Sequence, residues 1–278
     1  MKVGSKVVFL LRDSDGFSDA ISGAFHPKPS NTTIEESFEL SLEHYGIKNC
    51  KASGSIRHFL DHQGQYEVSV LLMQYYEPPI LACAVNEVLA QIAGQKSSSI
   101  PTIVAPFVVA SSKLKLESKS ATKFEGKVSL YGTEIGSETT ISKAMATRSQ
   151  KPPPTMQIHH EPLACFLQLV RVLKLPTYVL IGERGLRISD KEELEILYEM
   201  GELLASTLNL YFSRDEITWN PTRKTKDDKE PWRVIELLKL ELADLGQDLI
   251  TRSPQLRHSN LKCLSLPCPL FHVRICTI

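Results

Sequence analysis

Hydrophobic runs alternate with amphipathic segments along most of the chain. Short, nearly uncharged runs predict buried strands, and segments whose apolar residues recur every three or four positions predict helices. Strands are expected at Lys6–Leu11, Asn49–Phe59, Glu67–Gln74, Ile100–Ala110, Gly126–Ile135 and Tyr178–Ile181. Helices are expected at Thr33–Tyr45, Ile80–Ala93, Leu163–Lys174 and Asp190–Asn209. This alternation predicts an α/β fold with a mostly parallel central sheet flanked by helices.

Prolines and glycines set several of the expected boundaries. Pro78 and Pro79 stand directly before Ile80, where proline is tolerated because the first helical turn needs no amide donor there. Gly94 is expected to end the same helix. Pro101 and Pro106 would each remove a ladder hydrogen bond, so a bent strand or two short strands are expected between residues 100 and 110.

The chain is expected to divide into three parts. Residues 1–220 form a single α/β domain, in which the polar, proline-rich segment 137–158 is expected to be a mobile loop. Residues 221–250 form a charged linker followed by an amphipathic helix, which either packs back on the sheet or binds another protein. Residues 251–278 carry four basic and no acidic residues, and are expected to form an unstructured tail. One interpretation is that this tail is an alternative terminus that was never selected for packing.

Charge and composition narrow the possible partners. The chain has 278 residues, with 32 Lys plus Arg against 32 Asp plus Glu, so its formal net charge is zero. A protein that binds nucleic acid or a membrane surface electrostatically needs a basic excess, so neither partner is expected. The apolar run Val7–Leu11 is too short for a signal peptide or a membrane span. Because the cysteines are widely spread along the chain, they are expected to be free thiols. The expected location is the cytoplasm, with the nucleus as a second compartment.

Two groups of residues resemble metal ligands. Three thiols and one imidazole lie within fourteen positions of the tail, a set that suits tetrahedral zinc: Cys263, Cys268, His272 and Cys276. Their spacing matches no zinc-finger signature, and a coincidental cysteine-rich tail remains the other interpretation. His58 and His62 flank Asp61 and would share one helix face. Because this segment is expected to be a strand, surface histidines are the preferred interpretation.

The clearest candidate acid–base group is His159-His160-Glu161, which precedes a predicted helix. No nucleophile motif accompanies it, since the chain has no Gly-x-Ser-x-Gly elbow. Three thiols likewise lie in no motif of an activated nucleophile, namely Cys50, Cys83 and Cys165. Polar loop residues ahead of a helix explain this group without catalysis.

No phosphate-binding loop is predicted. Gly182 and Gly185 follow a predicted strand but lack the third glycine of a dinucleotide fingerprint, so residues 182–185 are interpreted as a turn. The charged stretch Thr222–Lys229 balances its basic residues with two aspartates, which indicates a solvated linker. The sequence therefore assigns no catalytic, cofactor or metal residue, and it does not identify residues that contact a partner.

Two longer segments resemble the proteasome assembly chaperone family. In VSVLLMQYYEPPILACAVNEVL (residues 68–89) a strand leads into a helix that begins with proline, and in GLRISDKEELEILYEMGELLASTLNL (residues 185–210) a helix begins at an aspartate. The resemblance implies a non-enzymatic, phosphorylase-like α/β protein that pairs with a second assembly chaperone and holds α-subunits of the 20S proteasome during ring assembly. Some family members dock through a terminal hydrophobic-Tyr-any tail. Here Thr277 stands at the tyrosine position between Cys276 and Ile278, which departs from that pattern.

Two other classes of function remain open at this point. An α/β enzyme of phosphorylase or hydrolase type, acting on a small molecule through His159, His160, Glu161 or a thiol, would share the same layout. A scaffold or adaptor domain without proteasomal partners is the third class. An enzyme should show a pocket where titratable groups converge, whereas a chaperone should expose a surface for a protein partner.

Overall fold

The computed structural model describes residues 1–28, 32–95, 100–115, 129–185 and 190–217. These residues belong to one compact unit that includes Met1–Pro221. The predicted linker and helix at 221–250, the zinc candidate and the tail 251–278 lie outside the described residues and remain predictions.

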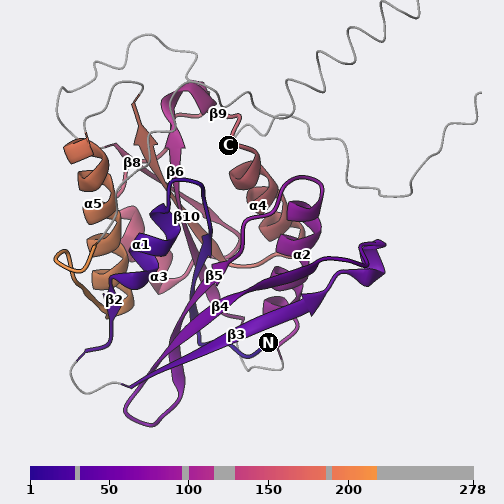
Figure 1. Cartoon of the computed structure of the whole chain (residues 1–278). Coiled ribbons are helices and arrows are strands. Elements are labelled where there is room, and N and C mark those ends of the chain that lie inside the picture. Colours follow the sequence, from indigo (N-terminus) through magenta and orange to yellow (C-terminus); the bar gives the residue numbers. More distant parts are fainter. Residues whose placement is uncertain (29–31, 96–99, 116–128, 186–189, 218–278) are drawn as a thin grey trace, which may run out of the picture. The chain divides into compact units, whose positions relative to one another are not determined.

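The centre of the fold is a seven-stranded sheet with the strand order β3-β4-β5-β1-β6-β10-β8 (Figure 1). Its strands are β1 (Lys6–Leu11), β3 (Thr33–Ser41), β4 (Lys51–Leu60), β5 (Tyr66–Met73), β6 (Thr102–Ala110), β8 (Leu130–Ile135) and β10 (Thr177–Arg184). The four neighbouring strands β5, β1, β6 and β10 are parallel, whereas β4 and β3 extend one side and β8 the other side in antiparallel orientation. The predicted α/β class with a central sheet is thus confirmed, and the parallel strands occupy its middle.

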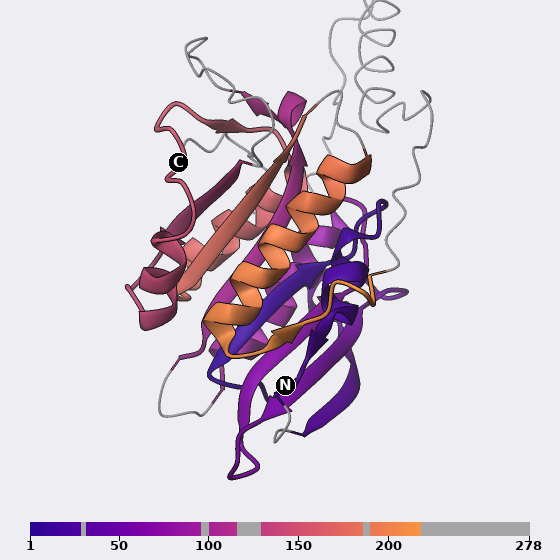
Figure 2. The same cartoon turned by 90° about the vertical axis from the view of Figure 1, so that its left-hand side faces the viewer.

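Helices cover both faces of the sheet (Figure 1). One layer contains α1 (Phe17–Gly23), α3 (Thr140–Ala146) and α5 (Asp190–Leu208), and the other contains α2 (Ile80–Ala93) and α4 (Glu161–Val172). Figure 2 shows α5 crossing the near face of the sheet. Because the parallel strands are buried on both faces, they read as continuous apolar runs, which explains why they were predicted well from the sequence.

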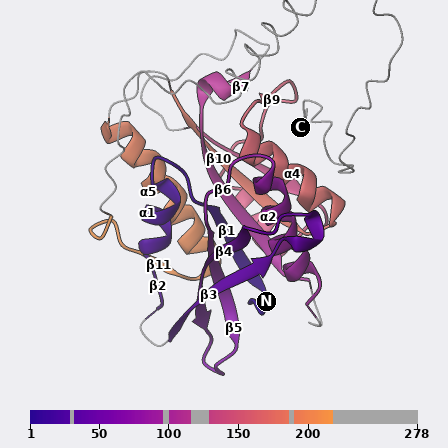
Figure 3. The same cartoon turned by 45° about the vertical axis from the view of Figure 1, so that its right-hand side comes forward.

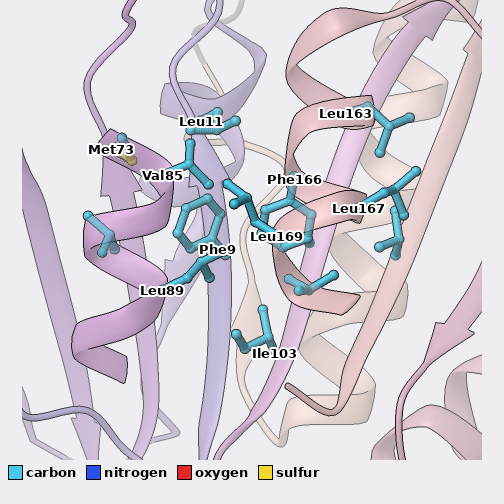
Figure 4. Packing of buried hydrophobic residues seen from close by; sticks show 14 of the residues in the cluster. Phe9, Leu11, Met73, Val85, Leu89, Ile103, Leu163, Phe166, Leu167 and Leu169 are labelled. Atoms are coloured by element: carbon cyan, nitrogen blue, oxygen red, sulfur yellow. The ribbon is translucent and has the colours of Figure 1, made fainter. Parts of the chain in front are cut away.

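A separate hydrophobic core lies on each face. On the α2–α4 face, the ring of Phe166 from α4 lies 5.0 Å from that of Phe9 on β1, centroid to centroid (Figure 4). It also lies 5.7 Å from the ring of Phe107 on β6. Val85 and Leu89 add the buried side of α2 to the same core. The aromatic contacts therefore join the helix layer to the two central strands.

Four short strands and two single-turn helices complete the described part. β2 (Phe25–His26) pairs with β11 (Tyr211–Phe212), and β7 (Leu114–Lys115) pairs with β9 (Gln157–Ile158). The 3-10 turns are η1 (Glu43–Tyr45) and η2 (Ser111–Lys113). The β2–β11 pair ties the chain after α5 to the chain after α1.

The prediction of a helix at Thr33–Tyr45 is wrong, because residues Thr33–Ser41 form strand β3. Its apolar residues Ile34, Phe38 and Leu40 lie at even positions, and all three share one face of the sheet. Ile34 and Phe38, which are four positions apart, also fit a helical spacing, whereas Leu40 does not. Pairing along the full length of β4 decides in favour of the strand, and this contact with a later segment cannot be read from local pattern.

The segment 137–158 was expected to be a loop, but it contains helix α3. The helix begins with a capping box, in which the Thr139 hydroxyl accepts the Ser142 amide and the Ser142 hydroxyl accepts the Thr139 amide. Ile141 and Met145 then bury one side of this short helix. Two apolar positions are too few to show a periodicity in a single sequence.

Strand β6 is continuous despite Pro106. Its pairing with β1 covers only Thr102 to Val104, so no ladder bond to β1 requires an amide hydrogen at position 106. The other side of the strand remains paired with β10 up to Ala110. Pro106 is therefore accommodated at a position where β1 no longer pairs with β6.

The predicted turn at residues 182–185 is also wrong, because β10 continues through Gly182 to Arg184. A Cβ atom at position 182 would approach Ile196 to 2.7 Å and the Met200 sulfur to 3.0 Å, both on α5. Glycine is therefore required here by the close approach of α5 to the sheet, and not by a turn or a phosphate.

Replacing Gly182 by valine is expected to destabilise the protein by about 1–3 kcal/mol, because the new side chain must displace α5 from the sheet. Urea unfolding followed by circular dichroism measures this change. Gly23→Ala is the matched control, since a Cβ atom at position 23 meets nothing within 4 Å. Equal stability of the two variants would contradict the packing argument.

Candidate functional site

The described structure has two regions that could serve as a functional site. In open α/β sheets, ligands usually bind beyond the carboxyl ends of the parallel strands. Here that edge holds the residues that follow β1, β5, β6 and β10. The second region is the antiparallel side of the sheet, where β3 forms the outermost strand.

The carboxylate after β1 has a structural role. Asp13 accepts hydrogen bonds from the amides of Asp15, Phe17 and Ser18 at 2.9–3.0 Å. The amides of Phe17 and Ser18 belong to the first turn of α1, whose orphan donors are thereby satisfied. Both carboxylate oxygens of Asp13 are occupied by this cap.

Arg184 links the end of β10 to its neighbours. Its guanidinium lies 2.6 Å from the Asp15 carboxylate and 3.9 Å from that of Glu193 on α5. All three side chains are less than one-third exposed, so this network is more strongly coupled than a free surface pair. It holds together the β1–α1 turn, the end of β10 and α5.

The sequence candidate His159-His160-Glu161 lies at the same edge. The His159 amide donates to the Lys113 carbonyl at 2.8 Å, and the His160 carbonyl accepts from Ala164 in α4 at 2.9 Å. The His160 ring stands edge-on to Phe107, and its Nδ1 is buried without a hydrogen-bond partner. Burial, with smaller effects of Lys113 and Arg184, lowers the pKa of His160 to about 4.

The pKa shifts of His160 and Glu161 favour the uncharged form of each side chain. His160 is neutral near pH 7, and burial raises the pKa of the neighbouring Glu161 carboxyl. The imidazole and the carboxyl are thus both shifted towards their neutral forms by loss of water. His160 is half-buried and Glu161 is exposed at the start of α4, in agreement with the interpretation that did not require catalysis.

The candidate thiols are not activated. Cys165 lies on α4, and burial together with Glu161 and Cys83 raises its pKa to about 11. Nucleophilic cysteines need a lowered pKa, because the thiolate is the reactive form. Cys83 is buried on α2, and Cys50 is half-buried before β4. The sequence interpretation of these residues as ordinary free thiols agrees with this geometry.

His58 and His62 do not form a pair on one helix face. His58 is 0% exposed on β4, where its Nδ1 lies 2.8 Å from the Ser69 hydroxyl and its ring stacks on Tyr66 at 4.1 Å. Burial lowers the pKa of His58. His62 is exposed in the following turn. The prediction of surface histidines is therefore wrong for His58, which is a core residue.

Over residues 1–217, leaving out the undescribed gaps, no three His, Cys, Asp or Glu residues lie close enough to hold a metal ion. Nor does any helix in the described ranges have the length and apolar character needed to cross a membrane. The zinc candidate Cys263, Cys268, His272 and Cys276, the stretch Thr222–Lys229 and the last residue Ile278 lie outside the described residues.

The antiparallel side of the sheet is more exposed. Both faces of β3 are largely open, and only Phe38 and Leu40 are half-buried against the core. Ile34 lies on the same face as these two side chains and is 40% exposed. These three side chains form a narrow apolar stripe, interrupted by Glu36, on one face of β3. Figure 3 shows the position of this outermost strand in the sheet.

An open groove of about 640 Å³ lies where β3 and β4 approach their connecting turn. Its lining is mixed and polar, with residues from β3, the turn, β4 and the end of β5: Glu39, Lys48, Asn49, Cys50, Lys51, Ser53, Gln74 and Tyr76. The Tyr76 hydroxyl is fixed in it, since it accepts the Ser53 amide at 2.7 Å and donates to the Lys51 carbonyl at 2.8 Å.

Sequence analysis did not find this region, because the segment was read as a helix. The available signal was the alternation of Phe38 and Leu40 with polar residues, which predicts a half-exposed strand but is interrupted by Glu36 before Ile34. Of the predicted candidates, only Cys50 lies in the groove.

The described residues thus form an α/β protein whose parallel core is extended by an exposed antiparallel hairpin. The chain belongs to the DUF7894 family, described as a domain of unknown function, whose model matches residues 1–236. No curated protein matches the chain.

Several solved structures are similar to this chain. A proteasome-assembly chaperone homologue from Mycobacterium tuberculosis is 11% identical, with a TM-score of 0.44 over 91% of this chain and 97% of that one. A PAC2 family protein from Streptomyces avermitilis is 10% identical, with a TM-score of 0.44 over 76% and 88%. A protein of unknown function from Corynebacterium glutamicum is 9% identical, with a TM-score of 0.46 over 89% and 86%.

Proposed function

We propose that this protein is a non-enzymatic assembly chaperone, which pairs with a second assembly chaperone and promotes formation of the α-ring of the 20S proteasome. The proposal takes proteasome assembly chaperone 1 as the member of that family to which this protein corresponds. The proposal includes a cytoplasmic or nuclear location, no nucleic-acid or membrane partner, and action by stoichiometric binding without a cofactor.

The observation that carries the proposal is the pair of segments that resemble the chaperone family. They form continuous units of the fold: residues 68–89 make β5, the Pro78-Pro79 entry and α2, and residues 185–210 contain α5. The first unit contributes to the core on one face and α5 to the core on the other. The resemblance therefore covers both layers of the sandwich and not one local motif.

The chemistry of the described site favours binding over catalysis. Asp13 caps a helix, Arg184 joins three elements, and the thiol of Cys165 is held protonated by burial. Each of these polar groups at the usual ligand edge of the sheet has a role in the fold. The exposed hairpin on the other side offers surface to a protein partner instead.

An affinity pull-down of the tagged chain is expected to recover a second assembly chaperone together with free proteasome α-subunits. Mature proteolytic particles should be absent from the eluate, as mass spectrometry can show. Because the chain carries no net charge, recovery should fall only modestly as salt is raised.

The same pull-down without residues 261–278 tests whether the tail is needed. Since Thr277 departs from the docking pattern, we expect the truncated chain to recover the same proteins. An eluate without proteasomal proteins, or a steep loss of recovery with salt, would count against the proposed function.

A further inference from the structure

In the part of the chain that the structure describes, the outer edge of β3 has no paired strand. Among the described residues, this nine-residue strand pairs only with β4. The bond from the Leu60 amide to the Thr32 carbonyl fixes which residues face β4, because bonded and non-bonded pairs alternate along an antiparallel ladder. The odd-numbered residues of β3, including Glu35, Ser37 and Glu39, therefore direct their N–H and C=O groups outwards.

The even-numbered face of β3 supplies the apolar part of the edge. Phe38 lies over Gly54 of β4, where a Cβ atom would come within 2.9 Å of its ring. Ile34 stands opposite His58 and is 40% exposed. A further strand on this edge would place its own side chains next to Ile34 and Phe38 and cover them.

The carboxylates of β3 lie on both faces. Glu35 and Glu39 lie on the odd-numbered face, whereas Glu36 lies on the even-numbered face between Ile34 and Phe38, and the strand contains no basic residue. Lys51 on β4 lies 2.7 Å from Glu39, and Arg57 lies 3.7 Å from Glu35, so both cations stand on the inner side. An ionised carboxylate has about four acceptor sites, and those on the outer side remain open to a second cation.

A second copy of this chain does not suit the edge. Antiparallel pairing of two β3 strands about Ser37 would place Glu35 directly opposite Glu39 of the other copy. Pairing about Glu36 would place that residue opposite itself, and pairing about Phe38 would bring the two Glu39 side chains into diagonal contact. Like charges opposed across strands are destabilising, so these registers disfavour self-association.

We propose that β3 binds an extended segment of a partner protein as an added antiparallel strand. The segment carries Lys or Arg opposite Glu35 and Glu39, and apolar residues opposite Ile34 and Phe38. Backbone hydrogen bonds supply affinity, and the alternating side chains supply specificity. The identity of the partner as a second assembly chaperone rests on the proposed function, whereas the chemistry of the segment rests on the strand itself.

The first test uses a fluorescent nonapeptide of alternating lysine and valine, titrated with the full chain in a fluorescence anisotropy assay. In the proposed arrangement the lysines form the bonded pairs with Glu35, Ser37 and Glu39. N-methylation of the lysine amides should therefore weaken binding at least about tenfold. N-methylation of the valine amides keeps the same charge and should leave binding intact.

Variants of the chain test the same contacts from the other side. Ser37→Pro removes one outward amide, and Ser37→Thr is the matched control that retains it. The double variant Glu35→Gln, Glu39→Gln should weaken peptide binding about two- to thirtyfold, the range expected for two cross-strand ion pairs. Circular dichroism melting curves establish that each variant is folded before its affinity is compared.

Three results would overturn the proposal: equal affinity for both methylated peptides, equal affinity of the proline and threonine variants, or a dimer of the full chain that Ser37→Pro dissolves. Pull-downs separate this inference from the proposed function. If Ser37→Pro recovers the assembly chaperone as well as the unmodified chain does, the inference fails and the function stands. If methylation-sensitive peptide binding occurs but no proteasomal protein is recovered, the function fails and the inference stands.

Discussion

Truncation of Phe166 to alanine is expected to lower the free energy of unfolding by about 3–5 kcal/mol, the range measured for buried aromatic residues. Phe166 is 0% exposed and contacts Phe9 and Phe107, so its removal leaves a cavity between α4 and the two central strands. These strands pair over only three residues on the β1–β6 side, which makes the helix contacts more important there. Urea denaturation at pH 7, followed by circular dichroism, measures the loss.

Val172→Ala provides the control on the same helix. Val172 is 72% exposed at the end of α4, so its truncation is expected to change stability by no more than about 0.5 kcal/mol. A loss below about 1 kcal/mol for Phe166→Ala would show that the α2–α4 core adjusts to fill the space, which is inconsistent with the packing of Figure 4.

The elements that the sequence predicts well are those whose signals are local. β1 and α2 begin and end at the predicted residues, Lys6–Leu11 and Ile80–Ala93. For β1 the signal is a short run that is buried on both faces. For α2 it is an apolar periodicity bounded by Pro79 and Gly94, and neither signal depends on distant residues.

The elements that were mispredicted depend on contacts between distant segments. The pattern of β3 is ambiguous, because Ile34 and Phe38 fit a helical spacing while Phe38 and Leu40 fit an alternating one, and its pairing with β4 decides between them. Gly182 was interpreted as a turn residue because the approach of Ile196 and Met200 from α5 is invisible in the sequence. Candidate sites failed for the same reason, since they were sought by motif, whereas the exposed edge is defined by the absence of a further strand among the described residues.

The polar residues at the carboxyl edge of the sheet now form one consistent picture. Asp13 caps α1, Arg184 joins the end of β10 to the β1–α1 turn and to α5, and the backbone of His159 and His160 connects the end of β6 to α4. The type and position of a polar residue in the sheet therefore do not by themselves assign a functional site.

The lowered pKa values of His160 and His58 also predict how the stability of the fold responds to acid. The pKa of His160 in the folded state is lowered to about 4, against an ordinary value near 6.5. The unfolded chain therefore binds more protons between these values, and stability must fall as the pH falls from about 6.5 towards 4. The shift of about 2.5 units corresponds to a loss of about 3 kcal/mol across that window.

Neutral replacements isolate this contribution. Between pH 7 and pH 4.5, the free energy of unfolding is expected to fall less for His160→Asn than for the unmodified chain. The loss of unfolding free energy between these two pH values should be smaller by about 2 kcal/mol in the variant. The pKa of His58 is also lowered by burial, so His58 acts in the same direction. The double variant His58→Asn, His160→Asn should therefore lose even less unfolding free energy between pH 7 and pH 4.5.

The neighbouring Glu161 provides the check on sign. Burial raises the pKa of its carboxyl, so proton uptake by Glu161 stabilises the folded state as the pH falls. Glu161→Gln should therefore make the chain more sensitive to acid, opposite to the histidine variants. If His160→Asn retained the full pH dependence, the histidine would have to be protonated in the folded protein, and the buried, unpartnered Nδ1 at the start of α4 would need another explanation.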